Sequence, residues 1–203
     1  MTPAQRTSPP EKKSNIDKQY LTRIHTSHNL LLLGDSHIRG LTEKISCNLG
    51  NSFSVMGTIK QNADIKGITS SRYFTSTNLT KRDMIIFNGG TRDISRNNSK
   101  NGLHALKEFV QRASNTNVIL LEAPLRYDLP ISSCVNQEMK LFNKRMRSLM
   151  TPFNHSKVIN IPTEREHHTR HGLHLNKKGK YWIANNLAKK SRTHIFHLII
   201  THL

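Results

Sequence analysis

The sequence predicts an α/β protein with a parallel sheet sandwiched between helices. Short apolar runs of strand length alternate with amphipathic helical patterns about five times along the chain. Parallel neighbouring strands need a crossover to return the chain, and a helix usually provides it. The length of 203 residues suits one domain with room for a tail.

Five apolar runs are the expected strands. The first is a run of four leucines that ends at Gly34, and the second stops at Gly57. Runs of this length, bounded by glycine or polar residues, are typical of buried strands in a parallel sheet. The expected strands cover residues 29–33, 53–56, 83–87, 117–121 and 157–161.

Four segments between the strands have apolar residues at helical spacing. Three of them follow the first, third and fourth strands, and the fourth comes after the last strand. In the last of these, Trp182, Ile183 and Leu187 are expected to face inward, and Tyr181 is expected to lie in the core rather than stack on a base. The expected helices cover residues 36–49, 103–110, 135–149 and 176–190.

The two ends of the chain differ from its middle. Residues 1–28 are polar and charged with a Pro pair, which predicts a flexible basic arm without a secretory signal. The domain is expected over 29–190. Residues 191–203 form a C-terminal extension, either an added strand or an unstructured segment. The longest apolar runs are far shorter than the ~20 residues of a membrane span, and the two cysteines have no metal-type spacing, so we expect an intracellular chain.

The charge balance points to an anionic partner. Lys and Arg outnumber Asp and Glu by 31 to 13, which gives a formal net charge of +18 and a pI near 10.4. Small soluble domains usually carry a net charge of about 2–8. The excess is concentrated in residues 137–203. A field of this sign attracts nucleic acid or another polyanion, although a lysine-rich surface that serves solubility alone is the alternative.

A serine follows the first expected strand in the sequence Gly34-Asp35-Ser36-His37. At a helix N-terminus, unpaired backbone N–H groups favour developing negative charge. Ser36 in this place is a candidate nucleophile whose own N–H contributes to an oxyanion hole. The alternative is that Ser36 only caps the helix.

Other expected strand ends carry residues that suit acyl transfer. Gly57 follows the second strand, where a missing side chain lets a backbone N–H approach a substrate oxygen. The segment Gly-Gly-Thr-Arg-Asp at 89–93 follows the third strand, and His-Gly-Leu-His-Leu-Asn at 171–176 precedes the last helix. A nucleophile near the start and a histidine base near the end fit an α/β acyl-transfer enzyme.

With these four segments in order, the sequence resembles the SGNH (GDSL-type) hydrolase superfamily over roughly residues 29–190. It is most similar to the SGNH-like domains of insect genomes and of non-LTR retroelement first open reading frames. The resemblance implies a flavodoxin-like three-layer α/β/α sandwich with a five-stranded parallel sheet and no cofactor. It also implies a serine ester hydrolase with Ser36 as nucleophile, His174 as general base, and Ser36 and Gly57 as oxyanion donors.

Two positions depart from the family pattern. Arg92 stands at the position of the oxyanion-hole asparagine, and His171 replaces the triad acid. Removing one oxyanion donor typically costs about 10²–10³ in turnover, and the equivalent loss of the acid in serine proteases costs about 10⁴. The guanidinium of Arg92 is a possible substitute donor, so a Ser–His pair with a weakened or altered activity is expected.

A second hypothesis is a non-catalytic SGNH-like module that binds RNA or other nucleic acid. Superfamily members that lost catalytic residues and bind RNA support it. The candidate contacts, which otherwise belong to a solvated helix face, are the basic residues of the last helix: Lys177, Lys178, Lys180, Lys189, Lys190 and Arg192. The histidines at 167, 168, 171 and 174 suggest a shared metal ion, but solvated loop histidines are the favoured interpretation and no metal is expected.

Overall fold

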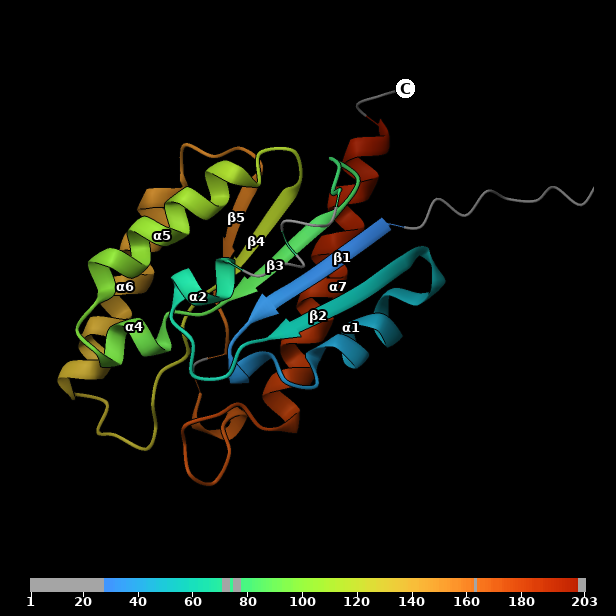
Figure 1. Ribbon diagram of the computed structural model, residues 1–203. Helices are drawn as coiled ribbons and strands as arrows, with labels where there is room; N and C mark the ends of the chain where they lie inside the picture. The colour runs from blue at the N-terminus through green and yellow to red at the C-terminus, as the bar shows by residue number, and fades with distance from the viewer. Residues whose placement is uncertain (1–27, 71–73, 75–77, 163, 201–203) are drawn as a thin grey trace, which may run out of the picture.

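A computed structural model describes residues 28–70, 74, 78–162 and 164–200, with residues 192–200 described by their backbone alone. The predicted basic arm at 1–27 lies outside the described residues. The described chain forms a three-layer structure with helices on both faces of a central sheet (Figure 1).

The sheet has five described strands that all run parallel, in the order β2-β1-β3-β4-β5. This confirms the predicted α/β fold with a five-stranded parallel sheet. All five strands end at the same edge, and Gly34 at the end of β1 is level with Ile59 of β2 and Asn88 of β3. The strands are β1 His28–Gly34, β2 Phe53–Ile59, β3 Met84–Asn88, β4 Asn117–Leu121 and β5 Ser156–Ile159.

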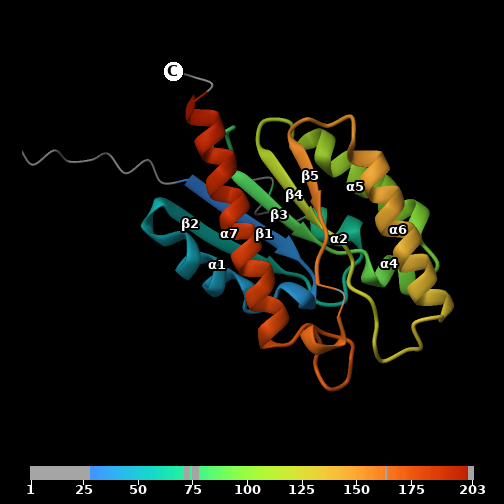
Figure 2. The same ribbon diagram turned by 180° about the vertical axis from the view of Figure 1, so that it is seen from behind.

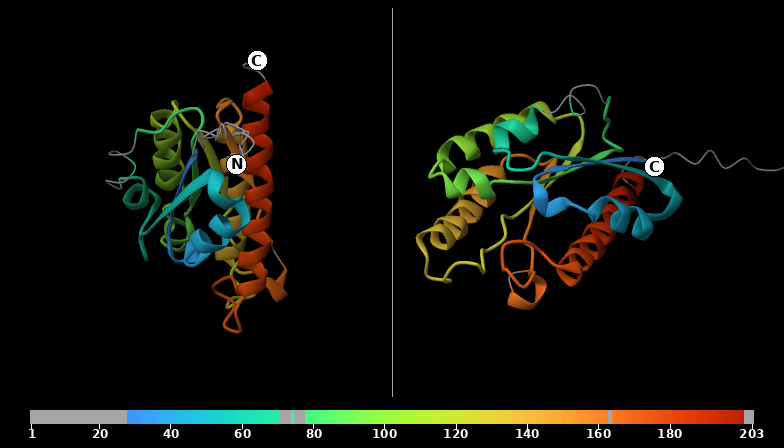
Figure 3. Two further views of the ribbon diagram at one scale, coloured as in Figure 1. Left: turned by 90° about the vertical axis from the view of Figure 1, so that its right-hand side faces the viewer. Right: turned by 60° about the horizontal axis from the view of Figure 1, so that its bottom comes forward.

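Of the described helices, two cover one face of the sheet and four cover the other (Figures 2 and 3). The first face carries α1 (Leu41–Leu49) and α7 (Lys177–Ile200), which lie side by side. Short 3₁₀ turns occur in the connections: η1 Ser36–Ile38, η2 Gly50–Ser52 and η3 Arg165–His167. The second face carries α2 Ile65–Thr69, α4 Thr91–Ser95, α5 Ser99–Arg112 and α6 Cys134–Met150.

The leucine run explains why β1 is central. Leu31 and Leu33 pack against the face of α2, α5 and α6, whereas Leu30 and Leu32 pack against α1 and α7. All four side chains are buried. Full burial of such a side chain stabilises a fold by about 1.5–3 kcal/mol, so a strand that is apolar on both faces takes the middle of the sandwich.

Two expected element boundaries are wrong at the site end of the sheet. The predicted helix over 36–49 is split, because Gly40 adopts a left-handed backbone with φ of 71° between η1 and α1. The second strand does not stop at Gly57 but continues to Ile59. Gly57 therefore lies inside β2, opposite Leu32 of β1.

The end of the chain also differs from the expectation. Helix α7 continues through residue 200, so residues 191–200 are neither an added strand nor an unstructured extension. Ile183 and Leu187 face inward as predicted, and Trp182 is partly buried. Tyr181 is 58 % exposed, so its predicted place in the core is wrong. In the described segments, no helix is long and apolar enough to cross a membrane.

Candidate active site

Ser36 lies where the direction of the chain connections reverses. After β1 the chain crosses one face of the sheet to reach β2, and after β3 it crosses the other face to reach β4. Open α/β sheets bind ligands in the crevice at this point, beyond the carboxyl ends of the strands. Ser36 follows β1 by two residues and is half-buried. The sheet thus presents its side chain at the expected edge.

Asp35 caps the turn that contains Ser36. The Asp35 carboxylate accepts a hydrogen bond of 2.9 Å from the backbone N–H of His37. The alternative that Ser36 only caps a helix is therefore wrong. Among the described residues, no hydrogen bond engages the Ser36 hydroxyl, so that group is available for a substrate.

His37 joins the end of β1 to the loop before α7. Its Nδ1 lies 2.9 Å from the Asp35 carboxylate and its Nε2 lies 3.2 Å from the carbonyl oxygen of Leu173. Each ring nitrogen of His37 therefore lies within hydrogen-bond distance of an oxygen atom. His37 is buried, and its contact with Leu173 links the end of β1 to the segment that carries His174.

His174 packs on the ring of His37. The centroids of the two rings are 5.0 Å apart. Burial lowers the pKa of His174 below the ordinary value of 6.5, and the nearby charges of His37, Lys180 and Arg39 lower it further, against an opposing effect of Asp35. A neutral imidazole is the form that a general base needs. Ser36 and His174 thus share one edge of the sheet, although no hydrogen bond joins them in the described chain; such bonds are often long before substrate binds.

The loop that carries His174 is held by its own glycine and asparagine. Gly172 has φ of 78°, and its carbonyl oxygen accepts a 2.9 Å bond from the backbone N–H of Tyr127. The Asn176 side chain accepts a bond of 3.0 Å from the N–H of Gly179, in the first turn of α7. The Asn176 amide also donates to the carbonyl oxygens of Glu166 and His168. The loop is therefore fixed on either side of His174.

The position of the triad acid supplies no partner for His174. His171 is exposed, and Nδ1 of His174 is buried without a hydrogen bond to any described residue. Asp128 is another carboxylate in this region. A hydrogen bond from Arg126 lowers its pKa, against a smaller effect of burial, and the charge of His174 contributes to the lowering. Arg126 holds the carboxylate at 2.5 and 3.1 Å, and among the described residues no hydrogen bond joins it to Nδ1 of His174.

Arg92 reaches across the end of β1. Its guanidinium donates to the side-chain oxygen of Asn62, which lies in the loop after β2. Because β2 and β3 flank β1, this contact spans the edge from which Ser36 projects. Asn62 has φ of 54°, a backbone conformation that favours glycine, asparagine and aspartate. The contact brings two side chains with spare N–H donors to the carboxyl edge of the sheet.

Gly57 occupies a different place from the one expected for an oxyanion donor. It lies within β2, and a Cβ at this position would stand 2.3 Å from the side-chain oxygen of Thr42 on α1. The missing side chain therefore allows α1 to pack closely on the sheet. The loop that follows β2, at Lys60 to Asn62, is the segment beside the end of β1, since the N–H of Lys60 donates to the carbonyl oxygen of Gly34 at 2.8 Å.

The four histidines at 167–174 do not converge. The His167 ring faces Glu164 at 3.2 Å, His168 packs on Tyr127 with centroids 4.7 Å apart, and His171 is exposed. In the part of the chain that the structure describes, no group of three or more His, Cys, Asp or Glu side chains is arranged to hold a metal ion.

The predicted basic residues of α7 fall into three environments. Lys177, Lys189 and Lys190 are exposed. Lys178 pairs with Glu166 at 2.7 Å. Lys180 is half-buried, and burial lowers its pKa, as do the charges of Arg39 and Lys44. The side chain of the predicted Arg192 lies outside the described residues. The helix thus carries exposed lysines and one lysine, Lys180, that is half-buried.

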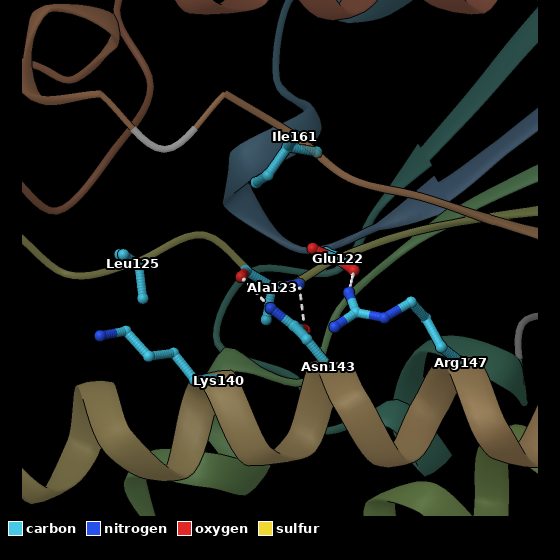
Figure 4. Close-up of a pocket in the computed structure, with 7 residues that line it drawn as sticks. All are labelled: Glu122, Ala123, Leu125, Lys140, Asn143, Arg147 and Ile161. Carbon is cyan, nitrogen blue, oxygen red and sulfur yellow. Dashed lines mark hydrogen bonds and ion pairs between the residues drawn. The ribbon is translucent and has the colours of Figure 1, made fainter.

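A separate pocket of about 280 Å³ lies beside α6 and is lined by none of the predicted site residues (Figure 4). Several of its charged and polar groups already have partners. Arg147 pairs with the buried Glu122, and the Asn143 amide bonds both the N–H and the carbonyl oxygen of Ala123 at 3.0 Å. The pocket is therefore best explained as part of the packing between α6 and the sheet.

The sequence did not indicate several residues at the site: His37, Asn62, Arg39 and Lys44. Asn62 had a readable signal, because asparagine soon after a strand is suited to a left-handed turn. The position of His37 next to Ser36 was visible, but its bond to Leu173 joins residues 136 positions apart. No local pattern predicts such a contact.

Comparisons with known proteins place the fold. No protein-family model matches the chain, and no curated protein matches it. Solved structures do match. A carbohydrate acetylesterase from Sinorhizobium meliloti has a TM-score of 0.67 at 11 % identity, over 82 % of this chain and 99 % of that one. A GDSL-like lipase from Bacteroides thetaiotaomicron has a TM-score of 0.65 at 14 % identity, over 81 % and 88 % of the two chains.

A third structure, a member of the lipolytic G-D-S-L family from Veillonella parvula, has a TM-score of 0.65 at 16 % identity, over 81 % of this chain and 97 % of that one. Identities this low carry information on fold alone. Together with the five-stranded parallel sheet and its helices on both faces, they lead to one conclusion: this chain has the α/β fold of the GDSL-type (SGNH) esterases and acylhydrolases.

Proposed function

We propose that the chain is a serine ester hydrolase with an altered active site, in which Ser36 is the nucleophile and His174 the general base. The observation that carries this proposal is their placement: both lie at the carboxyl edge of the sheet, and the lowered pKa of His174 leaves its ring neutral and able to take a proton. The esterase and acylhydrolase folds similar to this one support an ester as substrate.

In this mechanism, Oγ of Ser36 forms a bond to the acyl carbon while its proton passes to His174. The carbonyl π electrons move to the oxygen, and when they return the bond to the alcohol oxygen breaks. His174 gives the proton to the leaving alcohol. Water then repeats the attack on the acyl-serine, releasing the carboxylic acid and restoring Ser36.

The oxyanion donors differ from those of the family pattern. The backbone N–H of Ser36 is one donor, since it stands at the start of η1. The other donors in this proposal come from the Arg92–Asn62 contact, because its spare N–H groups span the end of β1. Gly57 keeps its place in the proposal only through the packing of α1, which holds β2 and its following loop in position.

A fluorophosphonate probe tests the nucleophile without a known substrate. We expect the probe to label the purified protein on the peptide that contains Ser36. The Ser36→Ala variant should lose the label, and His174→Ala should slow labelling by at least about 10³-fold, as for other nucleophile–base pairs. The matched control is Ser46→Ala, an exposed serine on α1, which should label at the parent rate.

Failure to label the folded parent chain, or equal labelling of Ser36→Ala, would contradict the hydrolase proposal. Intact mass and circular dichroism establish that each variant carries one substitution and remains folded. Peptide mapping then distinguishes Ser36 from any other serine that reacts.

A second candidate function is nucleic-acid binding through the basic C-terminal third. The observation that favours it is the exposure of Lys177, Lys189 and Lys190 on one helix of a chain with a net charge of +18. Phosphate contacts release condensed counterions, so affinity should fall steeply with salt, by a slope of about 0.9 per duplex phosphate contact.

Fluorescence anisotropy on single-stranded and duplex oligonucleotides measures that slope. Replacement of Lys177, Lys178 and Lys180 by Gln should flatten it by about one for each lysine that binds a phosphate. The control replaces three exposed lysines, Lys66, Lys100 and Lys107, on α2 and α5, which cover the opposite face of the sheet. Equal slopes for the two triple variants, or no binding at low salt, would assign the α7 lysines to a solvated surface.

The closer relationship to SGNH-like domains of insect genomes and non-LTR retroelements stays a prediction from the four sequence segments. An intracellular location also stays a prediction.

A further inference from the structure

We propose that Arg39, Lys44 and Lys180 form an anion subsite beside Ser36, and that the substrate is an ester that carries a phosphate or carboxylate group. This inference deepens the proposed hydrolase function and rests on it. It names the chemical class of the substrate, which neither the fold nor the similar structures supply.

Three different elements bring the cations together. Arg39 ends the η1 turn, three residues after Ser36, and Lys44 lies one turn into α1. Lys180 lies in the first turn of α7. Helices α1 and α7 pack side by side (Figures 2 and 3), and a 2.8 Å bond between the side chains of Asn48 and Asn185 joins them one turn further along.

Charges of this cluster act on Lys180 and on the proposed base, His174. The charges of Arg39 and Lys44 lower the pKa of Lys180, after burial as the larger cause. The charges of Lys180 and Arg39 are also among the causes that lower the pKa of His174. Arg39 and Lys44 therefore lie within electrostatic reach of Lys180, and Arg39 and Lys180 lie within reach of His174, beside the η1 turn that carries Ser36.

The three cations lack the partners that other basic side chains here possess. Lys178 pairs with Glu166, Arg126 with Asp128, and Arg165 donates to the carbonyl oxygens of Thr169 and Arg170. Within the described chain, Arg39, Lys44 and Lys180 form no hydrogen bond or ion pair through their side chains. Lys44 and Lys180 are nevertheless half-buried.

Half-buried ammonium groups without a counter-ion are unfavourable, because each loses hydration without gaining a partner. An anionic substituent of a substrate would relieve both the lost hydration and the mutual repulsion. Glu43 directly precedes Lys44 in the sequence, but its side chain is exposed. Its charge is not among the causes that change the pKa of Lys180. The space above Gly40 is open, since a Cβ there would meet no atom within 4 Å.

The kinetic test compares two activated esters that differ by one carboxylate, 4-nitrophenyl acetate and 4-nitrophenyl hemisuccinate. The parent chain should prefer the anionic ester in kcat/KM by about tenfold or more, the gain expected from a charge-assisted contact. Lys44→Gln combined with Lys180→Gln should remove this preference. The control, Lys66→Gln combined with Lys107→Gln on the opposite face, should keep it. Equal preference in the two double variants would overturn the subsite.

A binding test separates this inference from the proposed activity. In the Ser36→Ala protein, inorganic phosphate at constant ionic strength should shift the His174 ring resonances and raise its pKa, because the bound anion offsets the neighbouring cations. Adding the Lys44 and Lys180 substitutions should abolish the shift. If phosphate shifts no His174 resonance in Ser36→Ala, the anion subsite is overturned, even when the parent chain hydrolyses esters. If phosphate shifts the resonances but the parent chain hydrolyses no ester, the anion subsite is retained and the hydrolase proposal is rejected.

An oligonucleotide arm tests the nature of the anion. A twelve-nucleotide single strand should compete with the hemisuccinate ester no better than phosphate does at equal phosphate concentration. If the oligonucleotide inhibits at a far lower concentration than phosphate, the proposal of a small anionic ester as substrate is overturned. The three cations would then be assigned to binding the phosphates of a nucleic acid.

Discussion

At the scale of single residues, His174 is a base without an orienting acid. Its Nδ1 is buried and has no hydrogen-bond partner among the described residues, and its pKa lies below 6.5. A base with a lowered pKa stays neutral to a lower pH. The acid limb of kcat/KM, which reports the base in the free enzyme, should therefore have its midpoint below 6.5.

The variant His171→Asp restores the carboxylate of the family pattern. A carboxylate near the His174 ring favours the imidazolium that forms during attack, so turnover of an activated ester should rise by at least about tenfold. The same carboxylate raises the pKa of His174, so the acid limb should move to higher pH. Steady-state kinetics from about pH 5 to pH 8 measure both effects.

His171→Asn is the matched control for that change, because asparagine has the shape of aspartate without its charge. It should leave the acid limb in place. Unchanged turnover in a folded His171→Asp protein would show that this site is not organised for acyl transfer.

At the scale of elements, the loop between β5 and α7 depends on Gly172. A Cβ on Gly172 would stand 2.4 Å from the backbone carbonyl carbon of Tyr127, and its φ of 78° disfavours other residues. Tyr127 belongs to the loop between β4 and α6. The glycine therefore lets two loops approach and sets the position of His174.

Gly172→Ala should reduce kcat/KM by at least about tenfold, because displacement of a catalytic group by about 1 Å can cost 10²-fold. The control is Gly50→Ala. Gly50 has φ of 71°, but a Cβ added there would meet no atom within 4 Å. Both variants place alanine at a positive φ, and only Gly172→Ala adds a clash with the backbone of another loop. Equal activity of the two variants in an ester assay would argue against the loop contact.

At the scale of the whole molecule, the opposite edge of the sheet has its own anchor, Asp83. Its carboxylate accepts from the backbone and side chain of Asn29, at 2.7 and 3.1 Å, and from the backbone and side chain of Thr80, at 2.7 and 2.8 Å. Burial acts to raise the pKa of Asp83, but these four bonds together hold it below the ordinary 3.8. Asp83 thereby links the starts of β1 and β3.

Asp83→Asn should lower the free energy of unfolding at pH 7 by about 1.5–3 kcal/mol, the range for hydrogen bonds to a charged group. Because the folded pKa is depressed, this stabilisation is present above the unfolded pKa of about 3.9 and is lost as the pH falls through the folded value. Urea unfolding at about pH 7 and pH 3 should show a stability gap between parent and variant that narrows at the lower pH. If the difference in unfolding free energy between parent and variant is the same at both pH values, the Asp83 charge does not have this role. Fluorophosphonate labelling at neutral pH shows whether the substitution affects the distant Ser36.

Prediction from sequence succeeded where a local pattern decides the outcome. The leucine run predicts a central strand because only a strand covered on both faces buries four consecutive leucines. Ser36 and His174 could be placed at one edge because parallel strands share the direction of their carboxyl ends. The break at Gly40 was missed, since the apolar spacing of 36–49 continues through a turn that only the backbone angle of the glycine reveals.

Contacts between distant segments could not be predicted. The bond from Arg92 to Asn62 depends on how far β2 extends. Because the second strand was expected to stop at Gly57 rather than at Ile59, the loop that contains Asn62 was not expected at the edge of the sheet. The cluster of Arg39, Lys44 and Lys180 depends on the packing of α1 on α7, which lie more than a hundred residues apart in sequence. Such surfaces come from tertiary packing and leave no periodic signal in the chain.

The strand order also governs when the protein can fold during synthesis on the ribosome. β1 emerges early, yet its neighbour β3 and the helix α7 that covers Leu30 and Leu32 follow much later. Until α7 leaves the exit tunnel, α1 is the one helix of the described chain that covers that apolar face of the growing sheet. Nascent chains stalled before α7 are therefore the species most exposed to aggregation and most dependent on chaperones.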